Sequence, residues 1–208
     1  AQSLADREAA YRLRYEVYVA EQGKPYPQAD HVNRLLADAL DDEAQIIVAE
    51  SDGDTVGTLR NNWLSSPATY AEYADLLGVN HFGSIPLERI AISSRLVFHP
   101  SYRFGAGRAR LFDFNYECGA EKDTKLCFML CVPQLAPLFK RIGYREYAAP
   151  VGDPVVGCLH RLCLEFDDLA YLVRIRSPFV AVAERLGIEA TDRPWLTTLL
   201  PETSTVHG

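Results

Sequence analysis

The sequence predicts an α/β (α+β) fold, in which helices cover a mixed central sheet and a helical extension follows at the C-terminal end. Three observations support this. Apolar residues recur at helical spacing within the first twenty positions, an Asp-Gly turn separates two apolar runs near residue 52, and strand-like and helix-like segments alternate beyond residue 87. The 208 residues, 48% hydrophobic and 24% charged, fit one globular domain.

The N-terminal half is predicted to hold helices around one β-hairpin. Apolar residues three and four positions apart indicate a first helix, which Gly23 and Pro25 end. Asp52-Gly53-Asp54 between two apolar runs is typical of a hairpin turn. The predicted elements are a helix over 4–20, a short helix over 32–40, strands over 45–51 and 55–62, a helix over 68–78 and a loop over 80–86.

The C-terminal half alternates between the two element types. The predicted elements are strands over 89–98, 125–132, 144–147 and 156–166, and helices over 107–121, 134–142, 168–176 and 178–187. Signals for regular structure are weak after Thr191, where we expect partial disorder. We therefore expect a single domain over 1–208, with a core over about 5–166 and a helical extension over about 167–208.

Composition and charge narrow the function. A net charge of -7 argues against non-specific nucleic-acid binding, and no apolar run approaches the roughly 20 residues that span a bilayer. Charges within the first twenty residues argue against a signal peptide, and five cysteines fit reduced thiols in a cytoplasm. The spacings Cys-x3-Cys and Cys-x4-Cys, within predicted strands, do not form a zinc knuckle, so no metal site is expected.

A glycine-containing loop follows the predicted strand over 89–98 and leads into a helix. Gly105 and Gly107 let the main chain approach a ligand closely, and the positive N-terminus of the helix favours a phosphate group. Arg103, Arg108 and Arg110 add positive charge to an acidic protein. This pattern suits a phosphopantetheine donor. The alternative is a glycine-rich turn with solvated arginines; a nucleotide P-loop is excluded because its Gly-Lys-Ser/Thr ending is absent.

The segment from Tyr102 to Gly107 resembles the acyl-donor loop of the Gcn5-related N-acyltransferases, Arg/Gln-x-x-Gly-x-Gly/Ala. Both glycines match, Tyr102 stands where the family has Arg or Gln, and Arg103 comes one place late. The resemblance implies a mostly antiparallel sheet and a donor site built by the central strand and this loop. The donor-binding residues that it implies are Leu96, Val97, Phe98, Arg103, Phe104, Gly105, Ala106, Gly107 and Arg108.

A second segment resembles the family's second donor-binding strand and helix. It consists of the strand over 125–132, the helix over 134–142 and Gly143-Tyr144. Many members of the family carry a tyrosine five places before the final aromatic residue, where it protonates the leaving thiolate. Phe139 occupies that place and has no proton to donate. The thiolate must therefore be protonated from elsewhere or leave unassisted into water.

The N-terminal half resembles a narrower group, the acyl-homoserine-lactone synthases and the long-chain N-acyl amino acid synthases. Arg14 and Tyr18 match their Arg followed four residues later by an aromatic residue, and Arg60 ends a matching Gly-x-x-Arg. Ser94-Arg95 matches their Ser-Arg, whereas Ile92 replaces a glutamate. The resemblance covers about 10–145. It implies an acyl carrier protein or coenzyme A thioester as co-substrate, no permanently bound cofactor and a small-molecule amine as acceptor.

The implied reaction is direct attack of an amine on a thioester, which requires a base and a hydrogen-bond donor for the carbonyl oxygen. Glu88 is the first candidate for the base, with Glu16 and His31 as alternatives; each is also a plausible solvated side chain. Backbone N–H groups near the centre of the strand over 89–98, where family members have a bulge, are candidates for the donor. The candidate acceptor-binding residues are Arg14, Tyr18, Arg60 and Arg95, and the arginines could instead pair with buried acids such as Glu16.

Two further functions fit the same sequence. The absence of the tyrosine at Phe139 and of the glutamate at Ile92 fits a catalytically silent module that binds acyl thioesters or regulates another protein. A small-molecule acetyltransferase that uses acetyl-coenzyme A is the third hypothesis. The length of the acyl chain that the protein accepts distinguishes it from the first.

Overall fold

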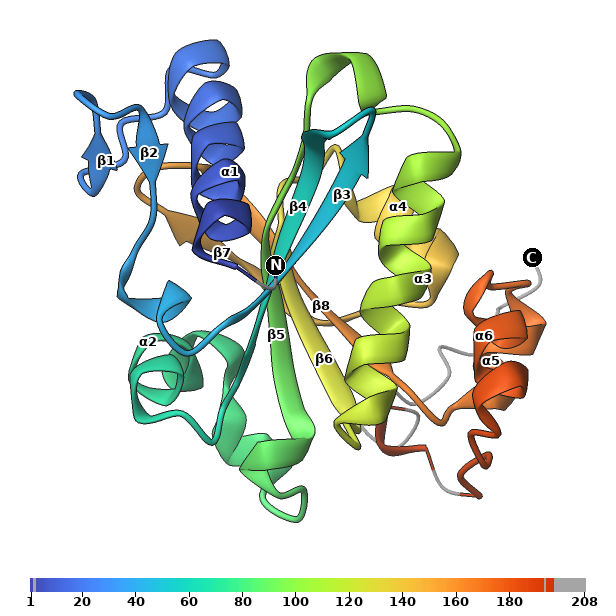
Figure 1. Ribbon diagram of the computed structural model, residues 1–208. Helices are drawn as coiled ribbons and strands as arrows, with labels where there is room; N and C mark the ends of the chain where they lie inside the picture. Colours follow the sequence, from blue (N-terminus) through green and yellow to red (C-terminus); the bar gives the residue numbers. More distant parts are fainter. Residues whose placement is uncertain (2, 193, 197–208) are drawn as a thin grey trace, which may run out of the picture.

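The computed structural model describes residues 1, 3–192 and 194–196, with the main chain alone at 80, 81 and 106 (Figure 1). Its centre is a six-stranded sheet in the order β3-β4-β5-β6-β8-β7. Neighbouring strands are antiparallel except β5 and β6, which are parallel. This confirms the expected mixed, mostly antiparallel sheet. The strands are β3 (Gln45–Ser51), β4 (Asp54–Trp63), β5 (Ile90–Phe98), β6 (Leu126–Cys131), β7 (Arg145–Asp153) and β8 (Gly157–Glu165).

Helices cover both faces of the sheet. Successive side chains of a strand point to opposite faces, so each face carries its own apolar cluster, against which helices pack. Ala91, Cys127 and Met129 pack with α3, α4 and the C-terminal helices, whereas Ile90 and Phe128 pack with α2. The helices are α1 (Leu4–Arg14), α2 (Pro67–Leu77), α3 (Ala106–Glu121), α4 (Ala136–Ile142), α5 (Leu169–Arg174) and α6 (Phe179–Leu186). These positions confirm the helices expected in the C-terminal half to within a few residues.

The expected first helix changes type midway. α1 begins at a capping box between Ser3 and Asp6 and ends at Arg14, and a π-helix then runs over Tyr15–Glu21. π-Helical turns are rare and often occur at functional sites. The wider turn lies beside the central strand, where the hydroxyl of Tyr18 donates a hydrogen bond to the carbonyl oxygen of Leu96 at 3.0 Å.

The prediction of a helix over 32–40 is wrong. This segment holds a short hairpin, β1 (Ala29–Asp30) and β2 (Leu35–Leu36), followed by a 3-10 turn over Ala39–Asp41. The carboxylate of Asp30 accepts hydrogen bonds from the N–H groups of Val32 and Asn33, both at 2.9 Å. Such local side-chain bonds offer the main chain an alternative to a helix. The loop expected over 80–86 likewise contains a 3-10 turn, over Val79–Phe82.

The C-terminal extension is packed into the core. Leu172 and Phe179 join the cluster beneath α3 and α4, and Leu196 is fully buried in the opposite cluster. The carboxylate of Glu165, itself buried, accepts hydrogen bonds from the N–H groups of Trp195 and Leu196 at 2.7 and 2.9 Å. The tail expected to be disordered after Thr191 is thus ordered at 194–196, and its remaining residues, 193 and 197–208, lie outside the described part of the chain.

Strand β5 is interrupted at its centre. Its parallel pairing with β6 ends at Ser93, and on the other side Arg60 of β4 lies opposite Ser94 while Thr58 lies opposite Val97. One residue of β4 therefore faces two of β5, Arg95 and Leu96, which is a β-bulge. Arg95 has a φ of 54°, in the left-handed region. The bulge expected in this strand is present, and the main chain at the two bulged residues has ladder partners on neither side.

Candidate active site

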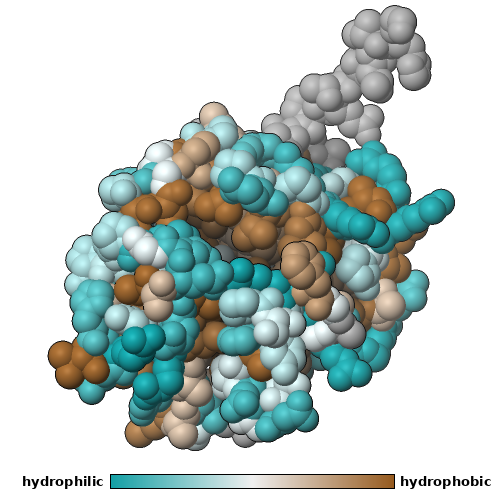
Figure 2. Space-filling view, turned by 90° about the horizontal axis from the view of Figure 1, so that it is seen from above, coloured by the Kyte–Doolittle hydropathy of each residue, from teal (hydrophilic) through white to brown (hydrophobic). Residues whose placement is uncertain are grey.

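A cavity of about 660 Å³ lies where β5 and β6 cease to pair. Figure 2, which looks down onto this end of the molecule, shows apolar side chains around a hollow. The bulged half of β5 forms one wall, and the end of β6 with the segment leading into α4 forms another. The π-helix and the loop after it, together with the β7–β8 turn, enclose the remainder. The space has the size and apolar lining of a small-molecule site.

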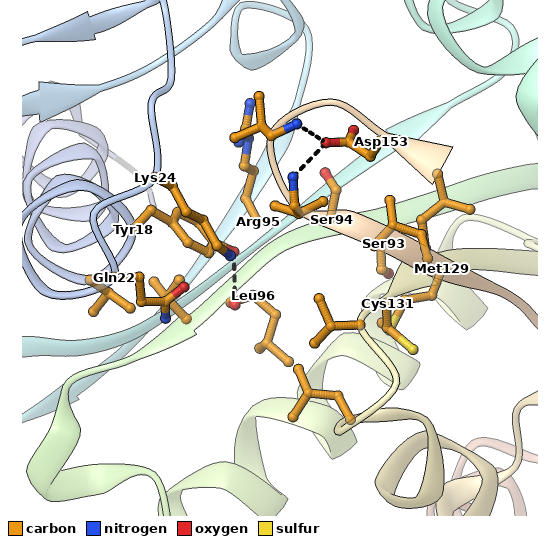
Figure 3. A pocket seen from close by; sticks show the side chains of 18 of the residues that line it. Tyr18, Gln22, Lys24, Ser93, Ser94, Arg95, Leu96, Met129, Cys131 and Asp153 are labelled. Atoms are coloured by element: carbon orange, nitrogen blue, oxygen red, sulfur yellow. Dashed lines mark hydrogen bonds between the residues drawn. The ribbon is translucent and has the colours of Figure 1, made fainter. Parts of the chain in front are cut away.

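Tyr18 joins the π-helix to the bulge. Its hydroxyl donates to the carbonyl oxygen of Leu96 and lies on the cavity wall (Figure 3). Burial, and to a smaller degree the neighbouring Tyr26, raises the pKa of Tyr18 to about 12. The hydroxyl therefore keeps its proton near neutral pH and serves as a hydrogen-bond donor rather than as a base.

Two cations and two aromatic rings lie together on the same wall. The guanidinium of Arg95 lies 4.9 Å from the ring centre of Tyr26, and the Nζ atom of Lys24 lies 4.8 Å from that of Tyr18. Burial lowers the pKa of Lys24, and the charge of Arg95 lowers it further, whereas Asp153 opposes the change. Positive charge thus collects on one side of the cavity, where a carboxylate would bind.

Asp153 is the last residue of β7 and lies at the turn into β8. Its Oδ1 atom accepts hydrogen bonds from the N–H groups of Val155 and Val156, both at 2.8 Å (Figure 3). Among the described residues that line the cavity, carboxylates occur only at Asp153 and Glu72, and Glu72 is solvent-exposed. Asp153 was not predicted as a site residue from the sequence, because its only local signal is that of a turn.

A buried ionic cluster stands behind the cavity. Asp41 contacts Arg14 at 2.8 Å and Arg60 at 3.4 Å, and Asp38 joins Arg60 to Arg95, at 2.5 Å from each. Arg14 and Arg60 have side-chain exposures of 0% and 1%, so neither reaches the cavity, whereas Arg95 lines it. The arginines thus pair with buried acids, as the alternative hypothesis proposed. These acids are Asp38 and Asp41, however, and not Glu16.

Acid should weaken this cluster. Burial alone would raise the pKa of Asp38, but the guanidiniums of Arg60 and Arg95 outweigh it, and the pKa lies below its ordinary value. Such a carboxylate stabilises the fold above its unfolded pKa of about 3.9, and the contribution disappears as the pH falls through the folded value. We expect urea unfolding to give a stability difference between wild type and Asp38→Asn that is constant in the neutral range and shrinks below about pH 4. A difference that persists unchanged in strong acid would contradict this.

The candidate bases from the sequence lie outside the cavity. Glu88 is exposed before β5 and lines a separate, open depression of about 570 Å³ with Glu43 and Lys122. Glu16 points to solvent and forms a bidentate pair with Arg34. His31 shares a hydrogen bond with the hydroxyl of Tyr15 at 3.0 Å. None of these three candidates is among the described residues that line the cavity.

The candidate donor-binding residues lie together at one end of the cavity. Gly105 has a φ of 123°, which favours glycine, and α3 begins directly after it, so Ala106 and Gly107 form its first turn. Arg103 pairs with Glu21 and bonds the carbonyl oxygen of Phe98, which turns it toward the π-helix. The residues of this group that line the cavity are Leu96, Val97, Phe98, Arg103, Phe104 and Arg108.

Two of the positions that depart from the family pattern, Phe139 and Ile92, have apolar surroundings. Each is 1% exposed and belongs to one of the two main apolar clusters. Four of the five cysteines are buried, and Cys158 is exposed. Within the described residues there is no group of three or more acidic, His or Cys side chains that could hold a metal ion, and no helix is long and apolar enough to cross a membrane.

Comparison with known protein families identifies one family. The family model of the N-acyl amino acid synthase FeeM matches residues 9–163. A search of curated protein sequences gave no match.

Three solved structures illustrate the similarity of fold. The acyl-homoserine lactone synthase BjaI, described as CoA-dependent and solved with SAM and isopentyl-CoA, superposes with a TM-score of 0.63 at 19% identity, over 87% of this chain and 92% of that one. TofI, in a ternary complex with an inhibitor and MTA, gives 0.64 at 19% identity, over 87% and 95%. FeeM, from uncultured soil microbes, gives 0.62 at 13% identity, over 79% and 92%.

Proposed function

The chain belongs to the N-acyl amino acid synthase FeeM family of acyltransferases, and on this premise we propose that it moves an acyl group from a pantetheine thioester to the amino group of an amino acid or related small amine. The observation that carries the proposal is the cavity at the bulge of β5, which the glycine loop and the start of α3 adjoin. The donor is an acyl carrier protein or an acyl-coenzyme A.

The bulge supplies the polar groups that the reaction needs. Arg95 and Leu96 lack ladder partners, so the main chain there is free to donate an N–H group to the thioester oxygen as negative charge develops on it. The hydroxyl of Tyr18 donates a hydrogen bond to the carbonyl oxygen of Leu96 and thereby holds the bulge in place. The amine attacks the thioester carbon directly, and the C–S bond breaks. Phe139, on the cavity wall, has no proton to give to the leaving thiolate, which takes its proton from solvent.

The acceptor is assigned to the positive wall. Arg95 and Lys24 attract a carboxylate, and Tyr26 offers a ring against which an acceptor side chain can pack. Arg60, a candidate for direct contact with the acceptor, pairs instead with Asp38, which also holds Arg95 in position. Arg14, the other candidate, pairs with Asp41 behind the cavity. Tyr18 lines the same cavity, which supports its expected role in binding the acceptor.

The role of the glycine loop in binding the donor can be tested by adding a negative charge to it. Gly107 lies in the first turn of α3, and a Cβ atom placed there meets open space. An aspartate at this position favours the helix but repels the donor phosphate, so Gly107→Asp should raise the donor KM about tenfold or more while the fold stays intact. Steady-state kinetics with acyl-coenzyme A provide the measurement, and Gly107→Asn is the uncharged control. An unchanged KM in the aspartate variant would move the donor away from this loop.

The proposed activity is tested by identifying the reaction products. Purified protein is mixed with acyl-coenzyme A or acyl carrier protein and a panel of amino acids, free thiol is followed over time, and mass spectrometry identifies any amide. Thiol release that depends on the amine and yields the matching N-acyl product supports the proposal. Donor binding without turnover across the panel would favour the silent module, for which the apolar Phe139 and Ile92 are the supporting observation.

A further inference from the structure

The family's acidic position on β5 is occupied by Ile92, and the acids that the sequence offered in its place lie outside the cavity. We propose that Asp153 is the catalytic base, which takes the proton from the ammonium group of the acceptor before attack. The inference rests on the proposed function and assigns a role that neither the family pattern nor the sequence analysis gave to this residue.

The geometry fixes one oxygen of Asp153 and leaves the other available. Oδ1 accepts both N–H groups of the β7–β8 turn, from Val155 and Val156, which holds the carboxylate in one orientation at the cavity wall. Within the described part of the chain Oδ2 has no hydrogen-bond partner. A carboxylate held in this way is ready to receive a donor from a bound substrate.

Its surroundings fit an acceptor that carries both charges. The titratable or charged residues that line the cavity with Asp153 come from every element around it: Tyr18 from the π-helix, Lys24 and Tyr26 from the loop after it, Glu72 and Tyr73 from α2, Arg95 from β5, Arg103 and Arg108 from the loop and helix that follow, and Cys131 from β6. Lys24, Tyr26 and Asp153 line the same cavity. Burial lowers the pKa of Lys24 and raises that of Tyr26, and the charge of Asp153 raises the pKa of both. A zwitterionic amino acid with its carboxylate toward Arg95 would then present its ammonium group to the second oxygen of Asp153.

The proton balance closes without another reactant. Asp153 accepts one proton from the ammonium group, and the neutral amine attacks the thioester carbon. The nitrogen loses its second proton to solvent water as the C–N bond forms and the C–S bond breaks, and the leaving thiolate takes up a proton from solvent, so that one proton in all is released. The products are the N-acyl amine and the free thiol, and Asp153 returns to its ionised form by releasing its proton to water.

The variant Asp153→Asn isolates this role, because asparagine keeps an oxygen that can accept from Val155 and Val156 but does not take up a proton. With an amino acid acceptor near neutral pH we expect kcat to fall by about 10²-fold, within the range for general bases. The loss should diminish as the pH rises and more of the amine is already neutral. Asp30→Asn, the matched change at an aspartate that also accepts two turn N–H groups but is not part of the cavity lining, should leave kcat within about twofold of wild type.

An altered acceptor separates proton transfer from structure. An aminooxy acid keeps the carboxylate of an amino acid, but its NH2 group is uncharged near neutral pH, so Asp153→Asn should use it almost as fast as wild type does. Equal losses with both acceptors would overturn the inference, since the aminooxy acid has no ammonium proton for Asp153 to remove. An unaffected kcat with the amino acid would overturn it too. A wild-type protein that is inactive with every donor and acceptor would overturn the proposed function, which the variant alone does not touch.

Discussion

Replacement of Asp41 by Asn is expected to lower the free energy of unfolding by about 3–5 kcal/mol, the range found when one partner of a buried ion pair is removed. Asp41 is 1% exposed and accepts from Arg14, whose remaining nitrogens, Nε and Nη2, already have no hydrogen-bond partner among the described residues. Asp41 also lies 3.4 Å from Arg60. A neutral amide leaves both guanidiniums undercompensated in a region that water does not reach.

Urea unfolding followed by circular dichroism measures this loss, and Asp42→Asn is the matched control. Asp42 is the next residue, has the same side chain and is exposed, so its substitution should change stability by less than about 0.5 kcal/mol. Equal effects of the two substitutions would show that the cluster contributes no specific stability.

Replacement of Glu165 by Gln is expected to cost about 3 kcal/mol and to release the segment that carries Trp195. The carboxylate has no exposed surface, lies 3.1 Å from Lys125 and 3.6 Å from Arg145, and accepts the N–H groups of Trp195 and Leu196. A glutamine offers one acceptor oxygen, and its NH2 group then faces donors. Two amides and two cations would compete for a single oxygen.

Two measurements report on this change. Denaturant unfolding gives the overall loss, and hydrogen exchange should show faster exchange at the amides of Trp195 and Leu196 than in wild type. Glu184→Gln is a suitable control, because Glu184 is exposed on α6. If the two amides keep their protection in the Glu165 variant, the carboxylate does not hold the segment.

The regular elements were predictable because their signals are local. The hairpin of β3 and β4 follows from Asp52-Gly53, and α3 follows from the loop that contains Gly105. The structure of the segment over 32–40 was not predicted correctly. Its hydrophobic residues suggested a helix, whereas hydrogen bonds to the carboxylate of Asp30 form a local turn that the spacing of apolar residues does not reveal. The π-helical turn at Tyr15–Glu21 leaves no distinct pattern in a helical sequence either.

In the candidate site, too, local signals were predictable and long-range contacts were not. Arg95 was identified from a short motif, and the need of a buried strand arginine for a carboxylate partner was anticipated. The partner itself, Asp38, is 57 residues away in the chain, and the pairing of Arg60 with the same acid depends on the alignment of β4 and β5. Asp153 reaches the cavity only because β7 extends to the turn with β8. Long-range placement of this kind is set by sheet register, which a single sequence does not encode in any one segment.

The buried cluster also determines what the cavity is prepared to receive. Three guanidiniums, those of Arg14, Arg60 and Arg95, share the two carboxylates of Asp38 and Asp41, so one positive charge is left over, and Arg95 carries it to the surface of the cavity. The cost of removing these cations from water is met when the chain folds. An anion that enters meets a charge already oriented and largely dehydrated, so little reorganisation free energy remains to be spent at binding. The site is in this sense preorganised for one additional negative charge.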